Sequence, residues 1–254
     1  MFRLLGFLIL SLPEIALALP KNWQFGFQEP ASAVMNRFVN FHNMLLVIIT
    51  GVMVFVFALL IYTCIRYHHK NNPTPNKFTH NLGIEILWTI IPCIILVIIA
   101  IPSFRLLYYV DTIGKMDMTV KVVGRQWFWQ YEYPDEKIAF DSYIIPDDQI
   151  KPGQHRLFDV DNELVLPVDT DIRIVVTGGD VIHSFAMPAL GIKIDAVPGR
   201  INETWVRITK PGQYYGQCSE LCGVGHGFMP ISLKAVSKEE YKIWAEEAKK
   251  KFAS

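Results

Sequence analysis

The sequence predicts a two-helix transmembrane hairpin followed by an all-β sandwich. Two long apolar runs without a formal charge, 44–65 and 86–104, lie in the first part of the chain. Short β-rich runs separated by turn residues follow them. Hydrophobic residues make up 51% of the 254 residues and charged residues only 19%, a more apolar balance than a soluble domain needs. This composition excludes a disordered chain, a collagen-like repeat and a small disulfide scaffold.

The chain begins with a segment typical of a secretory signal peptide. Arg3 precedes the apolar run 4–12, and the sequence Ala-Leu-Ala at 16–18 resembles a cleavage site with small residues at its outer positions. We expect cleavage near the end of that site, so that residues 1–18 are the signal peptide and 19–43 an external N-terminal segment. The alternative is an uncleaved helix that lies at the membrane surface.

Residues 44–104 are predicted to cross the membrane twice. Each apolar run is long enough to span a hydrocarbon core of about 30 Å. The loop 66–80 between them carries three Lys or Arg residues and no acidic residue. The excess of positive charge in cytoplasmic loops places this loop in the cytoplasm. Both ends of the hairpin then lie outside, as a signal peptide also requires.

Glu85 lies at the cytoplasmic start of the second span, and two interpretations stay open from the residues alone. An acid at a helix N-terminus is favoured by the helix dipole by about 0.3–1 kcal/mol. An ionisable group at a membrane boundary is also a functional candidate, here a carboxylate that takes up protons.

Residues 105–236 are predicted to form one external β-sandwich. Turn residues such as Lys-Pro-Gly and Gly-Gly separate short alternating or β-rich runs, and this pattern is typical of a β-sandwich. The predicted strands are Met118–Val123, Gln126–Tyr133, Ile172–Thr177, Thr204–Ile208, Gln213–Gly216 and Ile231–Ala235. Residues 237–254 end the chain, and the Glu- and Lys-rich run 238–252 predicts a helix with a solvated charged face.

Charge is distributed unevenly along the chain. Lys and Arg total 24 and Asp and Glu total 24, so no net charge attracts nucleic acid, and none is predicted as a partner. Residues 1–104 carry six basic and three acidic residues, whereas 127–225 carry eight basic and fifteen acidic residues. A charged partner should therefore meet the second half of the chain.

The sequence CSELCGVGHGFM contains Cys218 and Cys222, with His226 four residues further on and Met229 three beyond that. His183, after a predicted strand, offers a second imidazole. Thiolate, imidazole and a weak thioether are typical ligands of copper electron-transfer sites, whereas structural zinc sites use other spacings and no Met. A mononuclear copper site needs one thiolate, so the second could bridge a dinuclear centre in which each copper keeps one His.

Other interpretations of the cysteines stay open at this point. Cys218 and Cys222 could form a disulfide in an oxidising exterior, with Met229 in the core. Cys64 and Cys93 lie within the predicted spans and are interpreted as inert apolar fillers.

These features together resemble subunit II of the haem–copper cytochrome c oxidases, over nearly the whole chain. The resemblance rests on the two spans and the Cys-rich loop, and on three further motifs. These are QWFWQYEY at 126–133, DSY at 141–143 and VPGR at 197–200. The family implies a cupredoxin fold for the sandwich and a dinuclear CuA centre within it.

The resemblance also implies the ligands of that centre. Cys218 and Cys222 would bridge the two coppers, and His183 and His226 would ligate one each. Met229 would be a weak axial ligand, and the backbone carbonyl of Glu220 the opposite one.

Further roles follow from the same resemblance. The side chain of Glu220 would help to bind a Mg or Mn ion shared with subunit I. Trp127 would admit electrons from cytochrome c, although a core Trp on a strand is an ordinary alternative. Glu85 would lie at the mouth of a proton channel into subunit I. The acids that match a docking patch for cytochrome c are Glu132, Asp161 and Asp180.

The family therefore implies an electron-transfer subunit of a proton-translocating cytochrome c oxidase of the respiratory chain. This chain alone would carry electrons and not reduce oxygen. Expected partners are subunit I and other oxidase subunits, cytochrome c and the lipid bilayer. The signal peptide favours a bacterial plasma membrane over the mitochondrial inner membrane, with both termini and the CuA domain in the periplasm. The alternatives are a membrane-tethered copper chaperone and a structural subunit of a quinol oxidase, which lacks the copper ligands.

Overall fold

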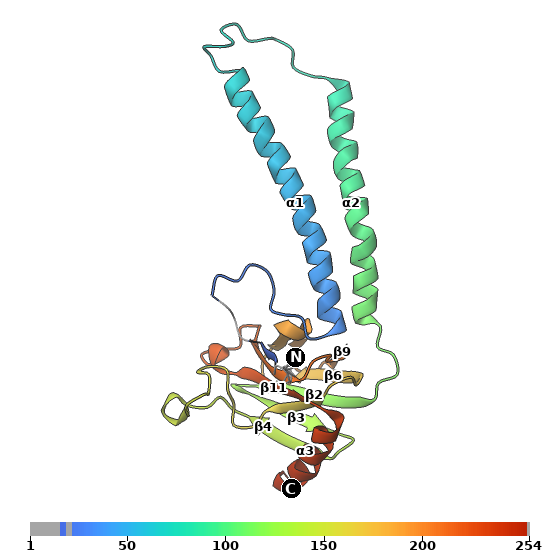
Figure 1. Ribbon diagram of the computed structural model, residues 1–254, viewed down its shortest axis with the longest axis vertical. Coiled ribbons are helices and arrows are strands. Elements are labelled where there is room, and N and C mark those ends of the chain that lie inside the picture. Colours follow the sequence, from blue (N-terminus) through green and yellow to red (C-terminus); the bar gives the residue numbers. More distant parts are fainter. Residues whose placement is uncertain (1–15, 19–21, 253–254) are drawn as a thin grey trace, which may run out of the picture. The chain divides into compact units, whose positions relative to one another are not determined.

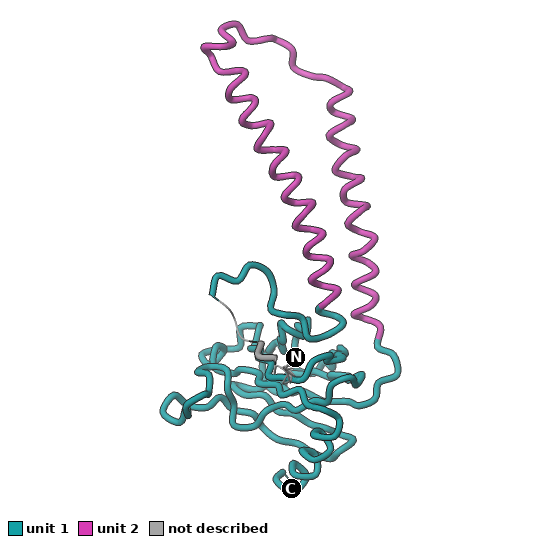
Figure 2. Tube along the Cα trace, in the orientation of Figure 1, with its two compact units in different colours: residues 1–35, 113–254 teal, residues 36–112 magenta. Residues whose placement is uncertain are grey.

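The chain folds into two compact units in a computed structural model that describes residues 16–18 and 22–252 (Figure 1). One unit contains residues 1–35 and 113–254, and the other contains residues 36–112 (Figure 2). The predicted signal peptide, residues 1–18, lies outside the described residues except for 16–18. These three residues form a short strand, β1 (Ala16–Ala18), parallel to the start of a later strand.

Residues 36–112 are helical at both ends. Helices α1 (Ala33–Arg66) and α2 (Leu82–Asp111) contain the two predicted spans and are long and apolar enough to cross a membrane. None of the most apolar stretch of either helix is buried within the chain. Such a surface is stable only against lipid or against other apolar helices. The two-pass membrane prediction is confirmed.

Helix α2 begins at a defined cap. The Asn81 side chain accepts a hydrogen bond from the backbone N–H of Ile84 at 3.2 Å, which satisfies one of the free donors of the first turn. Glu85 lies in that turn. The helix continues through Pro92 and Pro102 without a break.

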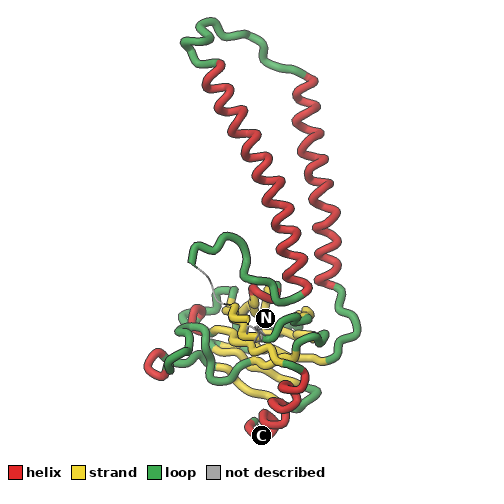
Figure 3. The backbone as a smooth tube through the Cα atoms, viewed as in Figure 1, coloured by secondary structure: helices red, strands yellow, loops and turns green. Residues whose placement is uncertain are grey.

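The larger unit is a sandwich of two β-sheets, whose strands are yellow in Figure 3. Its strands are β2 (Met118–Arg125), β3 (Phe128–Tyr133), β4 (Ile138–Ser142), β5 (Leu164–Pro167), β6 (Ile172–Gly178), β7 (His183–Met187), β8 (Ile192–Ala196), β9 (Asn202–Val206), β10 (Gly212–Cys218) and β11 (Pro230–Val236). One sheet has the order β5-β11-β10-β7-β8, with β1 paired to β10, and the other has the order β4-β3-β2-β6-β9.

Alternation of side chains along the strands builds the core between the sheets. In β3, Trp129, Tyr131 and Tyr133 are fully buried, while Phe128 and Glu132 on the other face are partly exposed. A period of two residues is expected where one face of a strand is buried and the other is solvated. The all-β sandwich predicted from such runs is confirmed.

The observed strands extend and add to the predicted ones. All six predicted strands are present, with ends shifted by a few residues, and β4, β5, β7 and β8 are additional. His183 is not in a loop after a strand but is the first residue of β7. The sequence motif QWFWQYEY is also not one continuous strand, because residues 126–127 form the turn between β2 and β3.

The C-terminal segment forms the predicted helix, α3 (Lys238–Lys251). Ser237 and Glu240 form a reciprocal capping box at its start, an arrangement that satisfies two free backbone donors. Tyr241, Ala245 and Ala248 face inward and are buried, so the charged residues lie on the outer face as predicted.

Candidate metal centre

Two adjacent strands and one loop position the predicted ligands. Cys218 ends β10 and pairs in register with Phe185 of β7, the strand that begins with His183. The chain after Cys218 turns back through Cys222 and a short 3-10 helix (His226–Phe228) to enter β11, which pairs with β10. Because of this reversal, His226 and Met229 lie near Cys218 at the end of β10.

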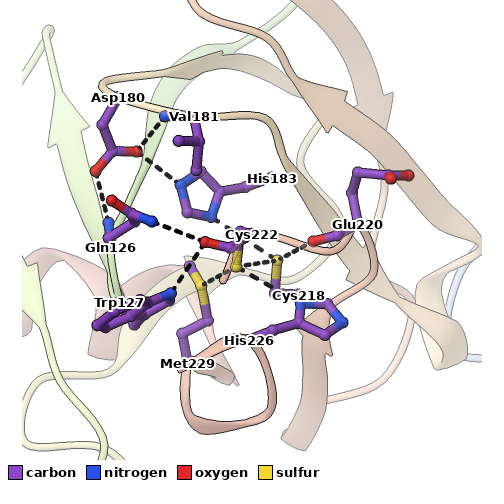
Figure 4. A network of polar contacts seen from close by, with 10 residues as sticks. All are labelled: Gln126, Trp127, Asp180, Val181, His183, Cys218, Glu220, Cys222, His226 and Met229. Atoms are coloured by element: carbon purple, nitrogen blue, oxygen red, sulfur yellow. Dashed lines mark hydrogen bonds and ion pairs between the residues drawn. The ribbon is translucent and has the colours of Figure 1, made fainter. Parts of the chain in front are cut away.

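The predicted donor atoms converge at this end of the sandwich (Figure 4). The two thiol sulfurs, Sγ of Cys218 and Sγ of Cys222, are 3.8 Å apart. Nδ1 of His183 lies 3.9 Å from the Cys218 sulfur, and Nδ1 of His226 lies 3.6 Å from the Cys222 sulfur. The thioether sulfur of Met229 is 3.6 Å from the Cys222 sulfur. Each thiol thus has one imidazole beside it.

Burial distinguishes the two halves of the cluster. Both cysteines, Met229 and His183 are buried, and His183 is completely inaccessible. His226 is only half-buried. A partner molecule can therefore approach the cluster from the His226 side, while the His183 side is enclosed by the sandwich.

The ring of His183 is oriented by Asp180. Its Nε2 atom is 2.8 Å from the Asp180 carboxylate, which leaves Nδ1 facing the Cys218 sulfur. A carboxylate that accepts the second ring N–H fixes the tautomer and orientation of a ligating histidine. Asp180 also accepts hydrogen bonds from the backbone N–H groups of Gln126 at 2.7 Å and Val181 at 2.6 Å.

These contacts lower the pKa of Asp180 and raise the pKa of His183. Desolvation alone would raise the pKa of Asp180, but hydrogen bonds from His183, Gln126 and Val181 outweigh it and lower the pKa below 3.8. Desolvation alone would lower the pKa of His183, but the hydrogen bonds with Cys218 and Asp180 raise it above 6.5. The pair therefore favours a charged carboxylate beside an imidazole that is held by its Nε2 proton.

The two thiols differ in acidity. Burial opposes ionisation of Cys218, but hydrogen bonds with His183 and with backbone groups of Glu220 and Ser184 lower its pKa to about 6. Burial and the neighbouring negative charge of Cys218 raise the pKa of Cys222 to about 12. One thiolate thus forms near neutral pH, and the second requires a further positive charge, which metal ions would supply.

Trp127 lies in the turn after β2 and not on a strand, so the expected strand position was wrong. Its ring is partly buried, and its indole N–H donates to the backbone carbonyl of Cys222 at 3.2 Å. The Gln126 side-chain amide donates to the same carbonyl at 2.9 Å. A Cβ atom on Gly225 would lie 2.3 Å from the Trp127 ring, so only glycine allows the loop to pass so close to the indole.

Trp129 and Gln126 support the loop in a way that the sequence analysis missed. The Trp129 indole N–H donates to the backbone carbonyl of Met229 at 3.2 Å and is fully buried. The contacts of Gln126 with the Cys222 carbonyl and of Trp129 with the Met229 carbonyl each join residues about a hundred positions apart. No local pattern in a single sequence indicates such a pairing. The short Asp180–His183 spacing is the only one of these contacts that is local in sequence, and Asp180 was expected only as a docking acid.

Glu220 presents two different groups. Its backbone carbonyl oxygen is 3.4 Å from the Cys218 sulfur, so it lies at the cluster. Its side chain is exposed and points away from the sulfurs (Figure 4). The structure thus places the carbonyl with the soft donors and leaves the carboxylate directed elsewhere.

The other predicted residues do not join this cluster. Glu85 belongs to the helical unit. Glu132 pairs with Lys121 at 3.0 Å, and Asp161 accepts a hydrogen bond from the backbone N–H of Tyr143 at 2.7 Å. Each of the three proposed docking acids, Asp180 included, therefore already has a partner within the chain.

The donor set fits copper. Two sulfurs, two imidazole nitrogens, a thioether and a carbonyl are soft or borderline ligands, and no carboxylate oxygen contacts either thiol among the described residues. Thiolate and thioether ligands select copper over harder ions. The spacing of the two sulfurs also shows free thiols and not a disulfide, which would require about 2.05 Å.

Comparison with known families identifies both units. Residues 118–236 match the family described as the periplasmic domain of cytochrome c oxidase subunit II. Residues 20–106 match the transmembrane domain of the same subunit.

Individual relatives agree over most of the chain. A probable cytochrome c oxidase subunit 2 of Rickettsia prowazekii is 59% identical over 226 residues, which are 89% of this chain and 72% of the relative. The cytochrome c oxidase subunit 2 of Cyanidium caldarium is 48% identical over 230 residues, which are 88% of this chain and 90% of the relative. The solved periplasmic domain of subunit II from Bradyrhizobium japonicum is 54% identical with a TM-score of 0.52, covering 56% of this chain and 99% of that domain.

Proposed function

This chain belongs to the cytochrome c oxidase subunit II family, and we propose that it admits electrons from cytochrome c into a respiratory oxidase. The observation that carries the proposal is the convergence of both thiol sulfurs, both imidazole Nδ1 atoms and the Met229 thioether at one end of the sandwich. A structural subunit without metal has no need of this donor set.

The residues fit a dinuclear copper centre. Cys218 and Cys222 would hold a copper pair, which would supply a one-electron carrier when bound. His183 and His226 present Nδ1 to opposite sulfurs, and Met229 and the Glu220 carbonyl complete the set. The protein keeps the His183 ring fixed through Asp180 and holds four of the five side chains away from water.

Trp127 is proposed as the residue that admits electrons. Its ring is partly exposed, and its indole N–H is bonded to the carbonyl of Cys222, a proposed ligand. A single hydrogen bond and the backbone of Cys222 therefore connect the protein surface to a thiolate. Trp127→Phe removes this hydrogen bond while keeping an aromatic ring.

The docking surface is proposed to combine acids with exposed apolar residues. Glu132, Asp161 and Asp180 contribute negative charge, which would steer a basic partner and make its association sensitive to salt. Leu221 and Val224 lie in the loop between Cys218 and Met229, and their side chains are 77% and 91% exposed. Exposed apolar side chains beside a redox site support contact with a protein partner.

Contacts with the rest of an oxidase are proposed for Glu220 and Glu85. The Glu220 carboxylate points away from the sulfurs, and a carboxylate suits a Mg or Mn ion shared with subunit I. Glu85, at the start of α2, is proposed to take up protons for the same subunit. Oxygen reduction and coupled proton translocation belong to the assembled complex, with subunit I and other subunits as partners.

The membrane location is proposed to be a bacterial plasma membrane. The basic loop 66–80 supports a cytoplasmic position for that loop, which puts both termini and the metal centre in the periplasm. The signal-peptide pattern at 1–18 supports the bacterial choice over the mitochondrial inner membrane.

Copper analysis with low-temperature EPR on the purified full chain tests the proposal. We expect a pair of coppers that share one unpaired electron. The pair should persist during dialysis against a mild chelator, whereas a copper chaperone would release it. A single copper, or a Cys218–Cys222 disulfide without metal, would overturn the dinuclear assignment. Slower cytochrome c oxidation by Trp127→Phe with an unchanged EPR signal would assign the electron route.

A further inference from the structure

A cleft between the two helices of the membrane hairpin is lined by two arginines that have no acidic partner among the described residues. Its volume is about 280 Å³, and it lies where α1 and α2 connect to the rest of the chain. Arg37, Asn40 and Arg105 form its polar side, and Phe41, Met44 and Leu106 form much of its apolar side. Charge and apolar surface therefore meet within one small cleft.

Neither arginine has an acidic partner among the described residues. Every salt bridge of the described chain joins other residues, and no acid lines the cleft. The acids of residues 36–112 are Glu85, at the other end of the hairpin, and Asp111. Asp111 lies six residues after Arg105, which rotates it by about 240° to a different face of the helix. The cleft is thus positively charged without compensation from the hairpin itself.

An aromatic contact between the helices holds Arg37 against the face of α2 that carries Arg105. The guanidinium carbon of Arg37 on α1 lies 3.7 Å from the centre of the Tyr109 ring on α2. Tyr109 is four residues after Arg105, so both lie on one face of α2. A guanidinium stacked on a ring still presents its N–H groups at its edge, where they can donate to an anion.

The positions of the two arginines along the helices would place the cleft at the depth of the lipid headgroups. Arg105 follows directly after the uncharged run 86–104, and Arg37 is seven residues, or about 10 Å along the helix, from the start of the run 44–65. Headgroups occupy the outer layers of a membrane about 40–45 Å thick with a core of about 30 Å. Phe41, Met44 and Leu106 offer apolar surface that continues toward the spans.

We propose that this cleft binds one anionic phospholipid of the surrounding bilayer. The phosphate group accepts hydrogen bonds from Arg37 and Arg105, since the planar guanidinium matches phosphate oxygens in pairs. The upper part of an acyl chain lies against the apolar residues of the cleft. The lipid thereby supplies the negative charge that the hairpin lacks and covers apolar surface between the helices.

Spin-labelled lipids test this proposal on the full chain. The chain is placed in phosphatidylcholine vesicles that contain spin-labelled phosphatidylglycerol or, in parallel, spin-labelled phosphatidylcholine. EPR then measures the motionally restricted fraction of each lipid. We expect the native chain to restrict phosphatidylglycerol preferentially. The double variant Arg37→Gln/Arg105→Gln should lose this preference, by roughly fivefold for each guanidinium removed.

Two control variants separate the cleft from general attraction to positive charge. Lys70→Gln/Lys77→Gln removes the same charge from the loop at the other end of the hairpin and should keep most of the preference. Met44→Trp fills the apolar side without changing charge and should weaken binding. If the native chain restricts both lipids equally, or if the lysine variant loses as much preference as the arginine variant, the proposal is wrong.

The assembled oxidase decides between a lipid and a protein partner. The same measurement is repeated on the purified complex, with the copper EPR signal as a check that the sandwich is intact. Preferential restriction of phosphatidylglycerol that is lost in the arginine variant supports the lipid. Loss of the preference on assembly would show that acidic residues of another subunit occupy the cleft, and would overturn the proposal.

Discussion

The sandwich buries its large apolar side chains, whereas the helical hairpin exposes them. In the sandwich, large side chains such as Trp129 and Leu164 are completely buried, whereas Val97 in the hairpin is 60% exposed. The sandwich therefore builds its own core, and the hairpin depends on lipid or protein to cover it. The difference shows which functional groups this chain can position by itself and which require surroundings.

The same difference holds for the functional residues. In the sandwich, the chain itself orients the donors: Asp180 holds His183, Gln126 and Trp127 hold the Cys222 carbonyl, and Trp129 holds that of Met229. In the hairpin, the side chain of Glu85 has no ion-pair partner among the described residues. The donors of the proposed metal centre are thus preorganised within the chain, whereas the described residues provide no ion-pair partner for Glu85.

Exchange of a single sulfur should have the largest effect, and only in the sandwich. Cys218→Ser removes the sulfur that contacts both Cys222 and His183, so we expect complete loss of the copper pair. Cys93→Ser in α2 is the matched control, because Cys93 is exposed and far from the donors in the sequence. Copper content and low-temperature EPR measure both variants. An intact paired signal in Cys218→Ser would exclude Cys218 as a bridging ligand.

Added volume beside Trp127 should have the next largest effect. In Gly225→Ala, the new methyl group would lie 2.3 Å from the indole ring, so the ring or the loop must move at a cost of about 1–3 kcal/mol in the free energy of unfolding. Denaturant unfolding of the copper-free chain, followed by Trp fluorescence, measures the cost. The loop also contains Gly227, where a Cβ would meet nothing within 4 Å, and Gly227→Ala should change stability by at most about 0.5 kcal/mol. Equal effects of the two variants would show that the indole contact is unimportant for stability.

The parts of the site that were predictable from the sequence are those that are local. Cys218, Cys222, His226 and Met229 lie within twelve consecutive residues, and their chemistry identifies them without a fold. The indole of Trp129 reaches a carbonyl 100 residues away. Such a contact depends on how the two sheets pack together, which one sequence does not specify.

A similar limit applies to the strands. Six strands were predicted because their side chains alternate or are β-rich. All residues of β5 and β7 are buried, so these strands carry no polar alternation to reveal them. Short buried strands cannot be told apart from other apolar segments by periodicity. The hairpin was easier to predict, because an uncharged apolar run of about 20 residues is typical of a membrane-spanning helix.

Removal of the Asp180 charge should have a smaller effect that depends on pH. The lowered pKa of Asp180 stabilises the copper-free fold above pH 3.8, and this contribution is lost as the pH falls through its folded-state pKa. The raised pKa of His183 stabilises the fold below pH 6.5, and this contribution is lost as the pH rises through its folded-state pKa. Asp180→Asn should therefore destabilise the copper-free fold most between these values.

Urea unfolding of the copper-free chain at several pH values measures this profile. The difference in unfolding free energy between the native chain and Asp180→Asn should be about 1 kcal/mol near pH 5, the size of a hydrogen bond to a charged group at partial exposure. It should shrink toward pH 3. A difference that is constant with pH would show that Asp180 does not act through its charge.

The smallest structural effect is expected in the hairpin, at Glu85. Glu85→Gln keeps the size of the side chain and removes a charge near the start of α2, where the helix dipole accounts for about 0.3–1 kcal/mol. Copper EPR and the first electron transfer from cytochrome c should be unchanged, because the metal centre is positioned by the other unit. If Glu85 takes up protons, steady-state turnover of the assembled oxidase should slow, and more strongly at high pH, where protons are scarce. Turnover equal to that of the native complex at every pH would leave Glu85 with its role at the helix start, and the hairpin would then act only as an anchor.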